Sequence, residues 1–175
     1  SAGLILFAFT AQANYRTQMN GMELGSLAIN HQSTQTYRDF GTLAKALGIK
    51  ETELQQQLYP HFVSRDPQNR YLVVWLSYDN TSIKPVDITT KSFSLIQATP
   101  FPPTEDEKAE GIGAVYQTGI ADSLLTDSWQ ATQTLYLKPR TRGTFGLIAS
   151  MPCKVGVINM NAPINISNVA QLKCN

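Results

Sequence analysis

Residues 71–78, with the sequence YLVVWLSY, decide the fold class predicted for this chain of 175 residues. The stretch combines β-branched, aromatic and aliphatic side chains and contains neither glycine nor proline, a composition that is typical of β-strands. It is followed by residues 79–82, DNTS, whose polar side chains favour turns because they hydrogen-bond to nearby backbone groups. We therefore expect a central strand that ends in a turn.

Alternating apolar and polar residues continue the β pattern along most of the chain. Residues 86–88 and 93–95 predict one pair of strands, and residues 135–137 and 145–149 predict another across a turn at Lys138 and Pro139. Further strands are expected within 14–35 and at 113–120, 155–160 and 164–172, with an acidic surface loop at 105–110 and a helical turn at 123–129. This spacing, with few helices, predicts a mainly β protein built as an antiparallel β-sandwich.

Upstream of the central strand the period of the apolar residues changes. Between Phe40 and Leu47 they recur at three- and four-residue steps, which places them on one face of a helix. Gly48 interrupts this pattern, and Pro60 ends a second one that follows it. We expect a short N-terminal helical hairpin, inserted at about residues 37–59.

The first thirteen residues allow two interpretations. Residues 4–9, LILFAF, are apolar, and residues 11–13, AQA, have the small-x-small pattern of a signal-peptide cleavage site. The run is too short for a membrane-spanning helix, which needs about 20 apolar residues. Residues 1–13 are therefore either the remnant of a signal peptide or the first strand of the domain, and residues 14–175 are expected to form a single β-sandwich domain.

The two cysteines, Cys153 and Cys174, both lie near the end of the sequence. They show no metal-binding spacing and have no histidine nearby. In an oxidising compartment they should form a disulfide that closes a loop of about 22 residues and stabilises the fold by roughly 3 kcal/mol. Two reduced core cysteines are the alternative. We expect an exported protein, periplasmic or secreted.

Charge and histidine content argue against several kinds of chemistry. Lys and Arg number 14 against 13 Asp and Glu, for a net charge of +1, so no nucleic acid is expected as a partner. The only histidines are His31 and His61, too few for a typical metal site. No Gly-x-Ser-x-Gly motif is present. We expect no enzyme, no catalytic residue, no metal and no cofactor.

A resemblance to a known family is carried by two segments. In residues 71–95 a hydrophobic strand runs into an Asn-x-Ser turn, then Lys-Pro-Val, then an aromatic residue; these elements are Val73, Trp75, Asn80, Ser82, Lys84, Pro85, Val86 and Phe93. Residues 137–147 add a Lys-Pro turn and a closing strand. Together they resemble the secreted bacterial immunoglobulin-like domains of the telokin-like type. The resemblance implies an immunoglobulin-like sandwich that is exported and has no catalytic residues.

These observations favour a non-enzymatic protein–protein interaction or structural module of the bacterial cell envelope, such as a subunit of a secretion or adhesion assembly. Its partners would be other envelope or surface proteins, contacted through edge strands and loops. The candidate contact residues are Phe101, in a stiff Phe-Pro-Pro stretch, and Tyr59, His61 and Phe62. Each could equally be a packing residue.

Three other readings stay open. Exposed Trp129 and Tyr116 would suit a secreted carbohydrate or small-ligand binding protein. Residues 43–58 resemble a helix-turn-helix, whose second helix offers Lys50, Thr52 and residues 55–57 to DNA. Asn80 and Asn165 match the N-glycosylation pattern, which matters only in a eukaryote.

Overall fold

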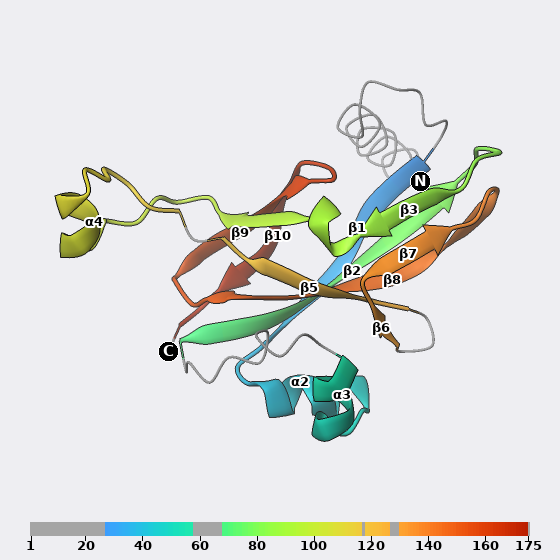
Figure 1. Ribbon diagram of the computed structural model, residues 1–175, viewed down its shortest axis with the longest axis horizontal. Helices are drawn as coiled ribbons and strands as arrows, with labels where there is room; N and C mark the ends of the chain where they lie inside the picture. The colour runs from blue at the N-terminus through green and yellow to red at the C-terminus, as the bar shows by residue number, and fades with distance from the viewer. Residues whose placement is uncertain (1–26, 58–67, 117, 127–129, 175) are drawn as a thin grey trace.

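The computed structural model describes residues 27–57, 68–116, 118–126 and 130–174 (Figure 1). The described part is mainly β and antiparallel. The strands are β1 Leu27–Tyr37, β2 Asn69–Asn80, β3 Val86–Thr89, β4 Ser94–Gln97, β5 Ile120–Leu125, β6 Ala131–Thr132, β7 Thr134–Leu137, β8 Thr141–Pro152, β9 Gly156–Ala162 and β10 Ile166–Leu172. The helices are α2 Phe40–Leu47, α3 Glu51–Gln57, α4 Glu105–Ala109 and the 3₁₀ helix η2 Thr90–Ser92.

The central strand predicted from residues 71–78 is confirmed as β2. The largest sheet has the order β1-β2-β8-β5-β6, so β2 has a neighbour on each side. Its pairing with β8 runs from Asn69 opposite Pro152 to Asn80 opposite Thr141 without a register shift. This long ladder satisfies the backbone groups of β2 inside the sheet. Its side chains can be almost continuously apolar because both faces of β2 are buried.

Alternation along β2 divides the buried residues between two cores. Leu72, Val74 and Leu76 belong to a core shared with β3, β4, β7, β9 and β10. Tyr71 and Val73 point to the opposite face and join a second core with α2 and α3. Successive strand residues face opposite sides, so the five-stranded sheet is covered on one face by the smaller sheets and on the other by helices.

The predicted strand pairs form strands but have different partners. Residues 86–88 lie in β3, which pairs with β7, whereas residues 94–95 lie in β4, which pairs with β9. Helix η2 separates β3 from β4, where a hairpin would need a tight turn. Likewise β7 does not pair with β8, because β2 and β5 occupy the two edges of β8.

Three other local predictions differ from the structure. Residues 105–110 are not a plain loop, since residues 105–109 form α4. Ser123–Leu125 are not helical; they belong to β5, where hydrogen bonding to β8 overrides local propensity. Of the strand predicted at 113–120, only Ile120 lies in a strand (β5) among the described residues, and Val115 and Thr118 form isolated bridges.

The helices α2 and α3 lie within the predicted insertion at 37–59. Asp39 caps α2 by accepting a hydrogen bond from the backbone N–H of Thr42 (2.7 Å), and Gly48 ends it with a positive φ of 69°. The apolar face of α2 is buried, and Phe40 meets Tyr71 of β2 edge-on with ring centroids 5.8 Å apart. Residues 1–13 lie outside the described residues.

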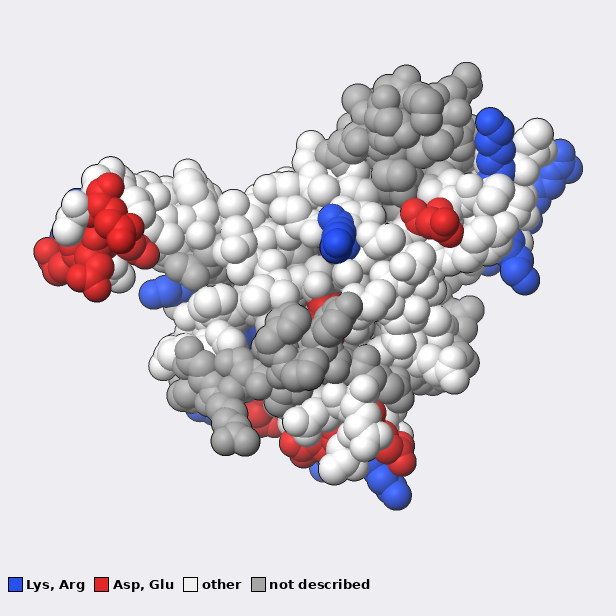
Figure 2. All heavy atoms as spheres, viewed as in Figure 1, with Lys and Arg blue, Asp and Glu red and all other residues white. Residues whose placement is uncertain are grey.

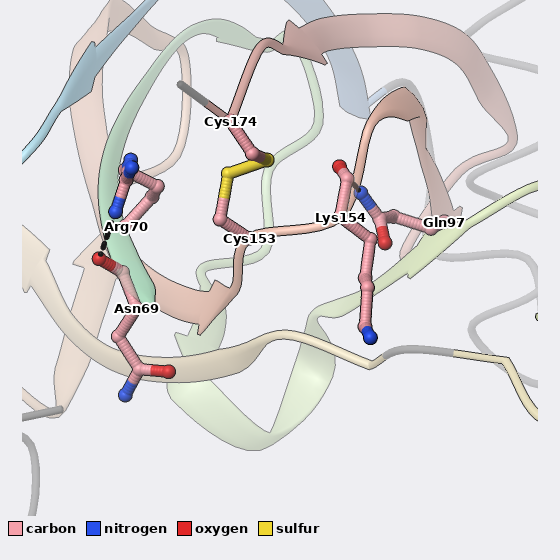
Figure 3. The surroundings of a disulfide bond; sticks show 6 residues. All are labelled: Asn69, Arg70, Gln97, Cys153, Lys154 and Cys174. Carbon is pink, nitrogen blue, oxygen red and sulfur yellow. Dashed lines mark hydrogen bonds between the residues drawn. A yellow bond between two sulfur atoms is a disulfide. The ribbon is translucent and has the colours of Figure 1, made fainter. Parts of the chain in front are cut away.

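The predicted disulfide between Cys153 and Cys174 is present, with the two Cα atoms 5.8 Å apart (Figure 3). Cys153 directly follows β8, and Cys174 follows β10. The bond therefore joins the five-stranded sheet to the three-stranded sheet of β10, β9 and β4.

Candidate functional site

The most prominent feature outside the sheets is an arm, defined as the described residues of 98–119 between β4 and β5. Figure 1 shows it extending from the sheets, with α4 at its tip. Phe101 and Val115 pair the outgoing and returning segments of the arm. The N–H of Phe101 donates to the carbonyl of Val115 (2.6 Å), and the N–H of Val115 donates to the carbonyl of Phe101 (3.1 Å). The arm is thus a paired ribbon.

The tip of the arm is ordered by its own backbone and side chains. The N–H of Thr104 donates to Glu107 Oε2 (2.7 Å), and the N–H of Glu107 donates to Thr104 Oγ1 (3.3 Å), which is a capping box. At the other end, Gly111 has a φ of 84°, and its N–H donates to the carbonyl of Lys108 (2.9 Å). The N–H of Ile112 donates to the carbonyl of Glu107 (2.9 Å), which completes a Schellman motif.

Although ordered, the tip buries nothing. Helix α4 has no buried residue, and the apolar side chains of Ile112 and Tyr116 are 38% and 49% exposed. Glu105, Asp106, Glu107 and Glu110 lie on or next to α4 and make the tip acidic, as the red group at the left of Figure 2 shows. Local hydrogen bonds therefore hold a charged and partly apolar surface out in solvent.

The base of the arm is fixed beside the disulfide (Figure 3). Gln97, at the end of β4, is fully buried, and its Nε2 donates to the carbonyl of Lys154 (2.6 Å). Lys154 follows Cys153 in sequence, and its Nζ lies 5.8 Å from the centroid of the Phe101 ring. This distance suits a cation–π contact. Gln97 and Lys154 thereby link the arm to the disulfide-bonded end of β8.

A second charged surface lies at the opposite end of the longest axis. We call it the basic end: residues 79–84, which include the β2–β3 turn, and residues 138–142, which include the β7–β8 turn. Its exposed cations are Lys84, Lys138, Arg140 and Arg142, with one acidic residue, Asp79, whose Oδ2 is 4.0 Å from Arg142 Nη2. Figure 2 shows Lys and Arg gathered at this end, on the right of the molecule.

Asn80 holds the two turns of the basic end together. Its Nδ2 donates to the carbonyls of Lys84 (3.0 Å) and Leu137 (3.2 Å), which are far apart in sequence. Its Oδ1 accepts from the N–H (3.2 Å) and the hydroxyl (2.8 Å) of Ser82. Asn80 is 0% exposed, so its side-chain amide is not accessible to a glycosylating enzyme. Asn165 is exposed.

The structure places only some of the predicted contact residues. Phe101 and Tyr116 lie in the arm, where Phe101 is half-buried and Tyr116 is exposed. Tyr59, His61, Phe62 and Trp129 lie outside the described residues. The sequence interpretation missed α4, Ile112 and the basic end. The Thr-x-x-Glu spacing of residues 104–107 is a capping-box signal that could have revealed α4.

The helix-turn-helix hypothesis gains no geometric support from the described residues. The buried residues of α2, together with Leu54 of α3, pack against the five-stranded sheet. Thr52, Gln55 and Gln56 are exposed, but they share α3 with Glu51 and Glu53. These carboxylates oppose attraction to phosphate.

Three titratable groups with a shifted pKa lie in β1 or just before α2. Burial lowers the pKa of His31, with a hydrogen bond to the Ser33 backbone opposing it, and burial raises the pKa of Tyr37. Hydrogen bonds from the backbone and hydroxyl of Thr42 lower the pKa of Asp39. No group of three His, Cys, Asp or Glu residues that could hold a metal ion occurs within the described residues.

In the described part of the chain, no helix has both the length and the apolar character needed to cross a membrane. Comparison with protein-family models, with curated proteins and with solved structures finds no match for this chain.

Proposed function

We propose that this chain is a non-enzymatic protein–protein interaction module, exported to the bacterial cell envelope, that contacts its partner through the arm. One observation carries the proposal: the arm is ordered by local hydrogen bonds while its tip buries none of its own residues. Ordering a segment costs conformational entropy. A surface that is already ordered binds with less of this cost, because the partner need not impose the order.

The chemistry of the arm supports a protein partner. Tyr116 and Ile112 offer apolar contact area, and the carboxylates at the tip of the same arm add charge that orients an approaching surface. Protein interfaces commonly combine an apolar centre containing aromatic residues with a polar rim. The arm has this composition on a small scale, so a single partner patch can cover it.

Export and the immunoglobulin-like assignment are also parts of the proposal. The Cys153–Cys174 bond is compatible with an exported protein, since disulfides persist in oxidising compartments. A core shared between antiparallel sheets supports a sandwich of the immunoglobulin-like type. The envelope assignment follows from that resemblance.

Site-specific crosslinking in the native host tests the proposal. A photo-crosslinking phenylalanine analogue is placed at Ile112 or at Tyr116, with exposed Lys45 of α2 as the matched control position. We expect one defined protein to crosslink from both arm positions but not from the control position. Excess purified wild-type chain should compete, whereas an Ile112→Ser, Tyr116→Ser chain should not. Equal crosslinking from all three positions, or none from the arm, would refute the proposed function.

A further inference from the structure

The two ends of the molecule carry opposite charges of equal size. Residues 104–112, at the tip of the arm, contain four acidic residues and one basic residue, a net charge of −3. The basic end contains four basic residues and one acidic residue, a net charge of +3. The whole chain has a net charge of only +1. The opposite charges of the two ends therefore come from where the charged residues lie in the folded chain, and the net charge of the whole chain does not reveal them.

Both ends also expose apolar side chains. In the arm these are Ile112 and Tyr116, and at the basic end it is Ile83, in the β2–β3 turn, which is 72% exposed. Each surface thus offers charge and apolar area together. A contact between them would pair carboxylates with ammonium and guanidinium groups and cover the apolar residues of both sides.

Both surfaces are held in place before any contact forms. The capping box and Schellman motif order the arm tip, and the buried Asn80 ties the two turns of the basic end to each other. Asn80 is 0% exposed and bridges carbonyls more than fifty residues apart, so it holds together the backbone of the two turns that carry the four cations. Preorganised surfaces lose less entropy on binding.

The two surfaces lie at opposite ends of the longest axis (Figures 1 and 2). A pair of different surfaces on one molecule forms a heterologous contact, which repeats from copy to copy unless the rotation closes a ring. From this we infer that the partner of the arm is the basic end of a second copy of this chain, so that copies join head to tail. This inference rests on the proposed function of the arm and names its partner.

Sedimentation velocity of the purified full chain tests the inference. At 0.01 M ionic strength, where the Debye length is about 30 Å, the average mass should rise with protein concentration. At 1 M salt, where the length is about 3 Å, it should return to that of the monomer. A wild-type chain that stays monomeric over the whole concentration range at low salt overturns the inference.

Charge reversal identifies the surfaces involved. An arm variant, Asp106→Lys with Glu110→Lys, and a basic-end variant, Lys84→Glu with Lys138→Glu, change exposed residues at each end. Each variant alone should associate at least ten-fold more weakly than the wild type. A mixture of the two should recover dimers, because the intact basic end of the first still meets the intact arm of the second. A contact between like ends uses only one of the two surfaces, so one of the two variants alone would then associate like the wild type, which would overturn the inference.

A control for the basic-end variant carries the same change in charge elsewhere: Lys91→Glu with Lys173→Glu, two exposed residues outside both surfaces. It should associate like the wild type, and an equal loss would overturn the inference by showing an effect of net charge alone. If self-association is absent but crosslinking from Ile112 and Tyr116 yields another protein, the head-to-tail contact fails while the proposed function stands. If crosslinking from the arm also fails, the head-to-tail contact and the proposed function are both refuted.

Discussion

Helices α2 and α4 begin and end with similar local signals but differ completely in burial. Both have a side-chain N-cap, Asp39 for α2 and Thr104 for α4, and both end in a Schellman motif at a glycine with positive φ. Phe40 and Leu43 of α2 are buried against the sheet, whereas no residue of α4 is buried. Capping is thus enough to form a short helix, but a helix packs against the sheet only where it has an apolar face.

This difference in burial implies that α2 contributes to the stability of the chain, whereas α4 contributes to binding. An isolated helix of five residues is too short to be stable without its caps, and α4 adds little to the core. Helix α2 closes one face of the central sheet. We expect substitutions in α2 to change the free energy of unfolding, and substitutions in the arm to change binding.

The largest effect is expected at Leu43, which is 0% exposed in the core between α2 and the sheet. Leu43→Ala removes buried methyl groups and leaves a cavity, so the free energy of unfolding should fall by about 2–5 kcal/mol. Urea unfolding followed by circular dichroism measures it. The control, Ile112→Ala in the arm, should change it by less than about 0.5 kcal/mol. Similar losses at both positions would remove the proposed distinction between the helices.

The disulfide comes next, because it supports both the sheets and the base of the arm. Cys153→Ser with Cys174→Ser should lower the free energy of unfolding by about 3 kcal/mol in the chain-entropy model. Hydrogen exchange should also show faster opening of the amides of Phe101 and Val115, since Lys154 and Gln97 link the arm to Cys153. A loss below about 1 kcal/mol, with unchanged exchange in the arm, would contradict this coupling.

Removing the two N-caps compares the helices directly. Asp39→Ala should lower the free energy of unfolding by about 1 kcal/mol, because a docked helix transmits the loss to the whole fold. Thr104→Ala should change the free energy of unfolding by less than about 0.5 kcal/mol. It should nevertheless abolish the protection of the tip amides from hydrogen exchange. These amides, which donate hydrogen bonds within the tip, belong to Lys108, Glu110, Gly111 and Ile112. A global loss from Thr104→Ala equal to that from Asp39→Ala would show that α4 supports the core.

The smallest effect is a pH dependence at the cap of α2. Hydrogen bonds from Thr42 lower the pKa of Asp39 below its ordinary value, so its stabilising contribution is present above that ordinary value and is lost as the pH falls through the lowered pKa. The contribution should be about a few tenths of a kcal/mol. Asp39→Asn keeps a capping oxygen without the charge, so the difference between wild type and variant in unfolding experiments should vanish at low pH. A difference that grows on acidification would reverse the expected sign.

Several features followed from the sequence because they depend on neighbouring residues alone. The strand at residues 71–78 and the helix at 40–47 are confirmed, since apolar period and local propensity are written in consecutive residues. The Cys153–Cys174 bond could also be predicted, because only two cysteines are present. The capping box of α4 is equally local; its signal was there to be found at Thr104.

Strand partners and the roles of single polar residues were decided by the tertiary structure. Local alternation predicts that residues 86–88 and 93–95 are strands, but it does not specify that they pair with β7 and β9. Asn80 is an ordinary turn residue in sequence, yet it is fully buried because a turn more than fifty residues away supplies acceptors for its amide. The positive charge of the basic end arises in the same way, since this end joins residues 79–84 to residues 138–142, whereas the acidic arm tip is one continuous segment. Pairing and burial depend on contacts between distant residues, and only the folded chain brings these together.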